Sequence, residues 1–134
     1  MSRLPALFLF AAGCCLVVGT GLGIAMGMAH DFHLAPVHAH LNLVGWTTLA
    51  LMGLTYRAWP QLAEARVLAP LQFTLSAGSA VAFPAGIYVS IEHEAPGLAI
   101  GAALVFLAGA LLFLARLLPL VLARRPAMAL AAAE

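Results

Sequence analysis

The chain has 134 residues, of which 64% are hydrophobic and only 8% are charged, and its formal net charge is +1. Because a soluble domain carries about 25% charged residues, this composition excludes an ordinary soluble domain and predicts an integral membrane protein. The sequence contains no Walker loop and no basic patch, so nucleotide and nucleic-acid binding are excluded as well.

Four apolar segments can be recognised, at residues 4–29, 36–57, 67–91 and 96–122. Each has about 20 or more residues, which as a helix is enough to cross about 30 Å of hydrocarbon. The runs are too long for membrane strands and do not alternate between apolar and polar residues. We therefore expect an all-α integral membrane fold, with one four-helix transmembrane bundle over residues 1–134. Short connectors make consecutive helices antiparallel neighbours.

Glycines recur every four residues in the first segment, at Gly19, Gly23 and Gly27. Small residues at this spacing let two helices approach closely, and such packing drives helix association in lipid. The fourth segment repeats the spacing with Gly97 and Gly101. The sequence therefore predicts self-association into a homo-oligomer within the bilayer.

The second segment begins with two histidines, His38 and His40. Ionisable groups at the edge of a membrane helix are costly, so they point to a function, and neutral imidazole is a common metal ligand. Residues two apart on an α-helix lie about 200° apart around its axis. The two imidazoles therefore cannot hold one metal from the same face. Either the first turn is irregular, or each imidazole serves a different partner.

Three neighbours of these histidines are candidate contributors to a site. Asn42 and Gly45 share a helical face with His38, and Asn42 lies one turn away, where an amide can orient an imidazole. An interhelical hydrogen bond is the alternative role for Asn42. Trp46 lies too deep for an interfacial aromatic belt, so we expect it to pack against a neighbouring helix or a large flat ligand.

The arginines and the acidic residues separate by side in a four-span topology. One side holds the arginines: Arg3, Arg57, Arg66, Arg116, Arg124 and Arg125. The other side holds Asp31, Glu92 and Glu94 together with all five histidines. By the positive-inside rule, both termini are cytoplasmic. We expect a multi-pass protein of a bacterial-type inner (plasma) membrane, with its histidines at the outer face.

Residues 38–46 read His-Ala-His-Leu-Asn-Leu-Val-Gly-Trp, and the apolar helix that follows ends in Tyr-Arg. This stretch resembles the catalytic subunits of the heme-copper oxidase superfamily, the cytochrome oxidases and nitric oxide reductases, and above all their short four-helix relatives. In the full-size family, a histidine near the outer end of the second helix is an axial ligand of the low-spin heme. The match at Ala39-His40 implies that role for His40. A His-x-His pair elsewhere in the family serves two hemes, and His38 and His40 are similar to it in spacing.

The resemblance also bears on assembly and activity. Full-size subunits have twelve helices in three arcs of four, so a four-helix chain resembles one arc, and a closed homo-oligomer such as a trimer is implied. The chain contains no His-His pair and no cross-linking Tyr-x-x-x-His, so one chain does not build an oxygen-reducing heme–copper centre. Enzymatic activity stays open, and an enzyme of this kind would be an oxidoreductase.

We interpret the chain as a membrane b-type heme protein for electron transfer or for gas or redox sensing, working with a redox partner. The cofactor-binding residues are expected to be His40, His38, Asn42, Gly45 and Trp46. The heme would be non-covalent, because the sequence has no Cys-x-x-Cys-His.

Two alternatives stay open. One is a copper or zinc carrier or sensor with a site at the outer face. Its candidate ligands are His30, His33, His38, His93, Asp31, Glu92 and Glu94. The other is a structural or assembly subunit of a respiratory complex, in which the histidines line an interface.

Overall fold

Three long apolar helices dominate the computed structural model, which describes residues 2–122. They are α1 (Leu4–Ala29), α4 (Leu68–His93) and α5 (Gly97–Leu122), each of 26 residues. All three are long and apolar enough to cross a membrane. No strand occurs within residues 2–122. The expected all-helical fold is confirmed for the described residues, and the first, third and fourth apolar segments form helices that could span a membrane.

The second apolar segment forms a rod that is helical without a break but not uniform. It consists of α2 (Ala35–His40), the π-helical segment η1 (Leu41–Thr48) and α3 (Leu49–Ala58), and the short 3-10 helix η2 (Pro60–Ala63) follows it. The sequence predicts one helix here and leaves open an irregular first turn; the irregular stretch is instead the π-helical segment, which begins after His40. Two threonine hydroxyls fit its wider turns by donating to carbonyl oxygens five residues earlier.

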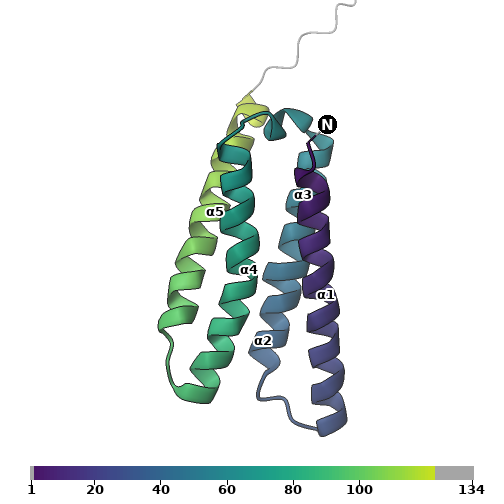
Figure 1. Ribbon diagram of the computed structural model, residues 1–134, viewed down its shortest axis with the longest axis vertical. Coiled ribbons are helices and arrows are strands. Elements are labelled where there is room, and N and C mark those ends of the chain that lie inside the picture. The colour runs from purple at the N-terminus through teal and green to yellow at the C-terminus, as the bar shows by residue number, and fades with distance from the viewer. Residues whose placement is uncertain (1, 123–134) are drawn as a thin grey trace, which may run out of the picture.

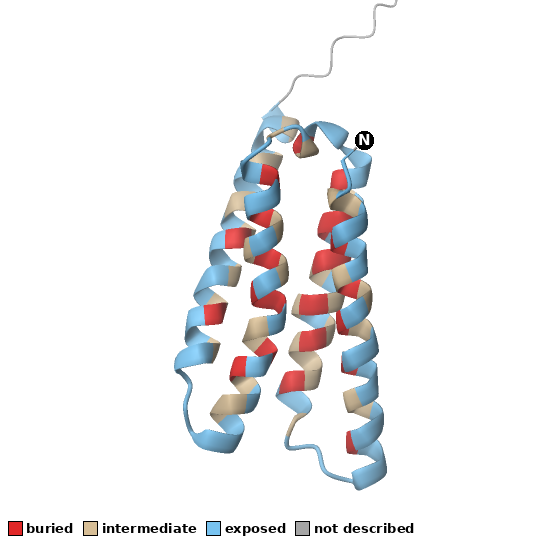
Figure 2. Cartoon of the chain, in the orientation of Figure 1, coloured by how far each residue is buried: buried red, intermediate tan, exposed pale blue. Residues whose placement is uncertain are grey.

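The rods pack in chain order, with consecutive rods antiparallel (Figure 1). Helix α1 packs against η1 and α3, α2 packs against α4, and α4 packs along α5. Buried residues lie on the sides of the rods that face one another (Figure 2). The main core gathers Phe8 of α1, Leu49, Met52 and Tyr56 of α3, and Ala80 of α4. These contacts fix the rod that carries His38 and His40 between α1 and α4.

Helices α4 and α5 approach so closely at Gly86 that a side chain would not fit there. A Cβ atom on Gly86 would lie 2.5 Å from the backbone nitrogen of Ala99. Only two residues of α5 are buried within the described chain, Ala102 and Gly109. Helix α5 is therefore held chiefly by its close contact with α4 and presents most of its surface outward.

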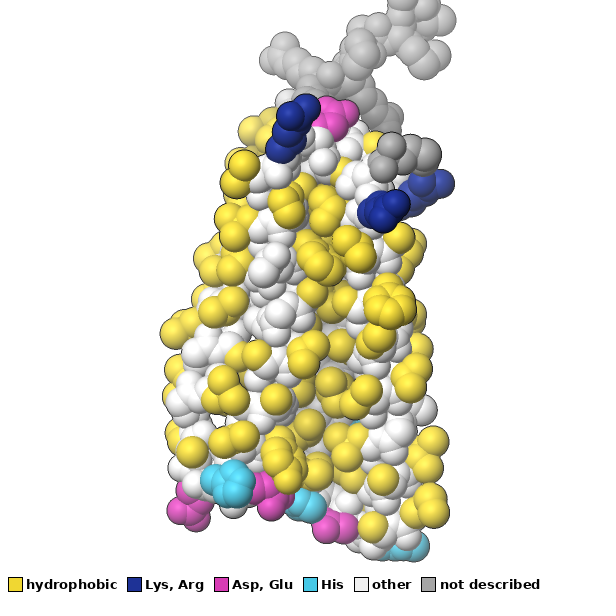
Figure 3. All heavy atoms as spheres, in the orientation of Figure 1, with side chains coloured by type: hydrophobic (Ala, Val, Ile, Leu, Met, Phe, Trp, Pro, Cys, Tyr) yellow, Lys and Arg dark blue, Asp and Glu magenta, His cyan; other side chains and the backbone are white. Residues whose placement is uncertain are grey.

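Charged side chains lie at the two ends of the bundle, and hydrophobic side chains cover the length between them (Figure 3). One end of the bundle, formed by the α1–α2 connector and the α4–α5 turn, carries Asp31, Glu92 and Glu94 and the histidines His30, His33 and His93. The opposite end carries Arg3, Arg57 and Arg66. Arg124 and Arg125, which belong to the same predicted arginine side, lie outside the described residues.

A hydrogen-bonded network is buried near the arginine end. The guanidinium of Arg116 on α5 donates to the hydroxyl of Tyr56 and to the backbone carbonyl of Leu62. The Tyr56 hydroxyl donates to Oε1 of Gln72 at 2.8 Å, and Nε2 of Gln72 donates to Oγ of Ser76 at 3.1 Å. Tyr56 and Gln72 are fully enclosed, with 1% and 0% of their surface exposed. The network joins the α3–η2 region to α4 and α5 in an otherwise apolar interior.

We predict that Tyr56→Phe destabilises the protein. The change leaves a buried acceptor on Gln72 and a donor on Arg116 without their partner, which costs about 1–3 kcal/mol. Thermal unfolding of the detergent-solubilised protein measures the effect. Tyr88→Phe is the matched control, because Tyr88 is 45% exposed, and it should leave the melting temperature unchanged. Equal melting temperatures for wild type and Tyr56→Phe would show that the network adds nothing to stability.

Candidate functional site

The imidazole of His38 is held against α1 by a backbone carbonyl. Its Nδ1 lies 2.7 Å from the carbonyl oxygen of Gly19. The ring also fills the space beside Gly23, where a Cβ atom would lie 2.7 Å from Cε1 of the ring. A carbonyl oxygen only accepts hydrogen bonds, so Nδ1 carries the hydrogen. In the neutral ring, Nε2 then bears the lone pair.

The side chain of Asn42 serves the backbone more than the imidazole. Its amide nitrogen donates to the carbonyl oxygen of His38 at 2.9 Å and lies 3.5 Å from Nδ1 of His38. Because Nδ1 already donates to Gly19, the longer contact joins two donors and is not a hydrogen bond. The sequence predicts that Asn42 orients His38, or else that it bonds to another helix. The structure gives the orienting role to the Gly19 carbonyl.

His40 has the same ring chemistry but faces a different helix. Its Nδ1 lies 2.7 Å from the carbonyl oxygen of Pro36, one turn earlier in the same rod. Its ring meets the ring of Phe83 on α4 edge to face, with 4.8 Å between centroids. Nδ1 is again the donor, so Nε2 of the neutral ring again bears the lone pair.

The two imidazoles therefore point to opposite neighbours, His38 to α1 and His40 to α4. The two rings lie against different helices, as their angular separation predicts. Two ring nitrogens with free lone pairs result, and they do not converge on one ion. Each is a suitable ligand for a separate metal or for a metal-bearing macrocycle.

Gly45 and Trp46 contribute to packing. Gly45 lies against α1, where a Cβ atom would be 2.6 Å from Cβ of Cys15. Trp46 is half-buried against the main core. Of its two predicted roles, the structure shows packing against neighbouring helices. An apolar hollow of ≈ 260 Å³ also lies nearby. It is lined by Cys14, Cys15, Val18, Leu41 and Val81.

The glycine pairs of α1 and α5 have different surroundings. Gly19 is filled by Asn42, and Gly23 is filled by His38 of the same chain. Gly27, Gly97 and Gly101 have open space where a Cβ atom would lie. Close approach at Gly19 and Gly23 therefore serves the candidate site, and of the five glycines predicted to drive association, Gly27, Gly97 and Gly101 remain available to a second copy.

His33 bridges two segments at the histidine end. Its Nδ1 lies 2.8 Å from Oδ1 of Asp31, and its Nε2 lies 3.0 Å from Oε1 of Glu92. Both nitrogens must donate to meet two carboxylates, which favours the protonated ring. The hydrogen bond to Asp31, and to a smaller extent the one to Glu92, raises the pKa of His33. The hydrogen bond to His33 in turn lowers the pKa of Asp31. This bridge ties the α1–α2 connector to the end of α4.

The proposed copper or zinc ligands do not converge. His30 ends α1 with a left-handed backbone, at φ 52°, and His93 is the last residue of α4; both side chains are exposed. Within residues 2–122, no three His, Cys, Asp or Glu side chains are arranged to hold a metal ion. Only Asp31, His33 and Glu92 come together, and there both ring nitrogens are engaged by carboxylates.

Three contributors to the site were missed at the level of sequence. Phe83 on α4 meets His40, and the Gly19 and Pro36 carbonyls hold the rings. The glycine spacing on α1 was a usable signal, because glycine opposite a histidine permits this contact. Phe83 gave no such signal, since its partner lies far away in the sequence.

Comparison with known proteins adds no family assignment. No protein-family model matches the chain, and no curated protein or solved structure matches it. A relationship to heme-copper oxidases rests on the resemblance at residues 38–46 alone.

We predict that Gly23→Leu disrupts the His38 side of the site. A leucine at this position collides with the imidazole, and overpacking of this kind costs about 1–3 kcal/mol. Gly21→Leu is the matched control, because it adds the same side chain to the same helix at an exposed position with open space around it. Thermal unfolding in detergent should show a loss for Gly23→Leu only. A similar loss in both variants would mean that leucine harms α1 wherever it is placed.

A second prediction concerns the pH dependence of the His33 bridge. Because the pKa of His33 is raised, its stabilising contribution is full below the ordinary histidine pKa and is lost as pH rises through the raised pKa. The Asp31 contribution is lost only in acid, as pH falls through its lowered pKa. An NMR titration should therefore place the His33 pKa above the usual value of about 6.5. Glu92→Gln should lower it, and Glu94→Gln should not. An equal response to both variants would refute a specific bridge.

Proposed function

We propose that the protein is a membrane-embedded b-type heme protein for electron transfer or for gas or redox sensing, with His40 as an axial ligand. The observation that carries this proposal is the hydrogen bond from Nδ1 of His40 to the Pro36 carbonyl. It fixes the ring orientation and leaves Nε2 as the electron-pair donor, which is the state an iron ligand requires.

The donor chemistry around His40 suits a heme. A neutral imidazole held by a carbonyl is a good donor to iron, and heme iron is commonly held by histidine. The aromatic ring of Phe83 stands beside the imidazole. When bound, the heme would supply reversible one-electron chemistry.

His38 is the second histidine in this proposal. Its Nε2 also bears a lone pair that a metal could accept. Its ring faces α1, however, so it does not bind the same iron as His40 of its own chain. A heme with two histidine ligands therefore takes its second imidazole from another copy of the chain. This is consistent with a homo-oligomer, and the open glycines Gly27, Gly97 and Gly101 are candidate contacts for it.

Four membrane spans with the arginines in the cytoplasm are part of the proposal. Three helices are long and apolar enough to be spans. The fourth span would be the rod from Ala35 to Ala58, which is helical without a break and runs antiparallel to its neighbours. The separation of charges between the ends supports cytoplasmic termini and outer histidines in a bacterial-type plasma membrane. The arc-like packing in chain order is consistent with a short relative of the heme-copper oxidase subunits.

The alternatives have less support. A copper or zinc site at the outer face would need at least three convergent ligands, and within the described residues only the His33 bridge gathers such groups. A structural or assembly subunit accounts for interface histidines. A structural role gives no reason for two imidazole rings that each keep a lone pair on Nε2.

We predict that His40→Ala abolishes the heme spectrum of the purified protein, because it removes the iron ligand. His93→Ala should leave the spectrum unchanged, since His93 is exposed at the end of α4 and touches neither candidate ring. His38→Ala separates two arrangements: loss of six-coordinate iron would mean that a second copy presents its His38 to the iron. Full heme retention with an unchanged spectrum in His40→Ala would refute His40 as the ligand.

A further inference from the structure

The arginine end of the bundle carries positive charge that no carboxylate of residues 2–122 neutralises through an ion pair. Within residues 2–122, four arginines lie at this end and Glu64 is the only acidic residue there. Both ion pairs in the described part of the chain belong to His33 at the far end. The positive charge is therefore available to an anion from outside the chain. The arginines are Arg3, Arg57, Arg66 and Arg116.

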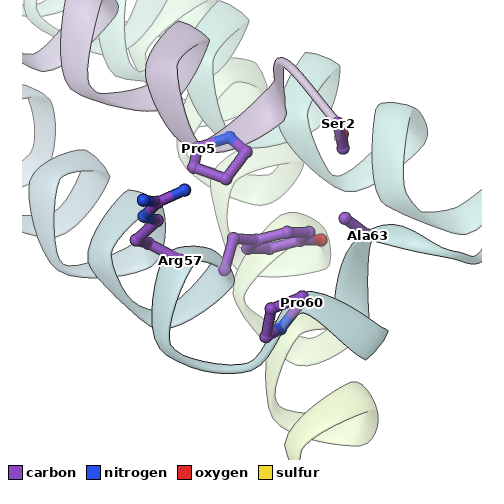
Figure 4. A pocket seen from close by; sticks show the side chains of 6 residues that line it. Ser2, Pro5, Arg57, Pro60 and Ala63 are labelled. Atoms are coloured by element: carbon purple, nitrogen blue, oxygen red, sulfur yellow. The ribbon is translucent and has the colours of Figure 1, made fainter.

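A small pocket opens among these charges. It lies where the start of α1, the end of α3 and η2 meet, and it has a volume of ≈ 80 Å³. Figure 4 shows Arg57 on one side and Ser2 on the other, with Pro5 and Pro60 between them. A water molecule occupies about 30 Å³ of liquid, so the pocket holds one group of roughly phosphate size and no acyl chain.

The polar groups of the pocket are donors. The Arg57 guanidinium has no carboxylate partner in the described chain and presents planar N–H groups that suit phosphate. The oxygen of Ser2 accepts from the backbone N–H of Leu4 at 3.2 Å, which leaves its own hydrogen free to donate. The start of α1 brings the positive end of a helix dipole to the wall and the end of α3 brings a negative end, so the two dipoles offset each other and the positive charge comes from Arg57.

The inner wall of the pocket is rigid. Tyr56 lines it, and the Tyr56 hydroxyl is held by Arg116 and Gln72. The Arg116 guanidinium carbon lies 5.3 Å from the centre of the Tyr56 ring, so a second positive charge stands behind this wall. The buried network thus keeps the shape of the pocket and adds to its positive potential.

We propose that this pocket binds the phosphate of an anionic phospholipid headgroup from the leaflet at the arginine end. Arg57 is the main ligand, and the Ser2 hydroxyl donates to a headgroup oxygen. A lipid is favoured over a free phosphate because the pocket lies at the end of helices apolar enough to span a membrane, where lipid headgroups are concentrated. The proposal rests on these spans and is independent of heme binding.

Native mass spectrometry of the full-length protein in detergent tests the proposal. Phosphatidylglycerol and phosphatidylcholine with the same acyl chains are added at equal concentration, and the bound lipid is counted. Wild type should retain the anionic lipid preferentially, and Arg57→Gln should lower that retention by roughly fivefold. Arg66→Gln is the matched control, because Arg66 lies at the same end and does not line the pocket.

A second variant keeps the test independent of Arg57. Ala63→Glu places a carboxylate on the pocket wall and should also lower phosphatidylglycerol retention, with phosphatidylcholine unchanged. The proposal is overturned if Arg66→Gln lowers retention as much as Arg57→Gln, because binding would then follow diffuse surface charge. It is also overturned if neither pocket variant lowers retention. Complete displacement by millimolar inorganic phosphate would assign the pocket to a soluble anion instead.

Discussion

The arrangement of the candidate site depends on one kind of interaction, a ring N–H that donates to a backbone carbonyl. His38 makes this bond to Gly19 and His40 makes it to Pro36, both at 2.7 Å. The carbonyl cannot donate in return, so each bond fixes the tautomer and leaves Nε2 with its lone pair. The bond of His38 is partly buried and that of His40 is exposed, so the bond of His38 is the less readily exchanged for one to water. The chemistry proposed for the protein follows from these two bonds.

The bond to Gly19 is possible only because α1 and the second rod approach closely. Gly19 and Gly23 supply the space, which is filled by Asn42 and His38. Gly45, on the second rod, likewise leaves room for the side chain of Cys15 on α1. At the opposite end, Arg116, Tyr56 and Gln72 hold α3, α4 and α5 together by hydrogen bonds. Small residues thus position the histidine end, and a polar network positions the arginine end.

Composition and segment length predicted α1, α4 and α5 closely, because a membrane helix is specified by a long apolar run. The separation of His38 from His40 was also predictable, since it follows from helix geometry alone. The π-helical segment was not, because its hydrogen bonds depend on threonines that suit an α-helix equally well in sequence. The contacts of His38 with Gly19, of His40 with Phe83 and of Arg116 with Tyr56 join distant residues, which a local pattern does not pair.

The visible absorption spectrum of the purified full-length protein, oxidised and then reduced, tests the central claim most directly when heme is quantified per chain. An imidazole held with Nε2 as donor predicts a Soret band, a shift on reduction and about one non-covalent heme b per ligand site. The absence of a Soret band in protein that was produced with heme available, together with about one bound copper or zinc per chain, would contradict the heme assignment.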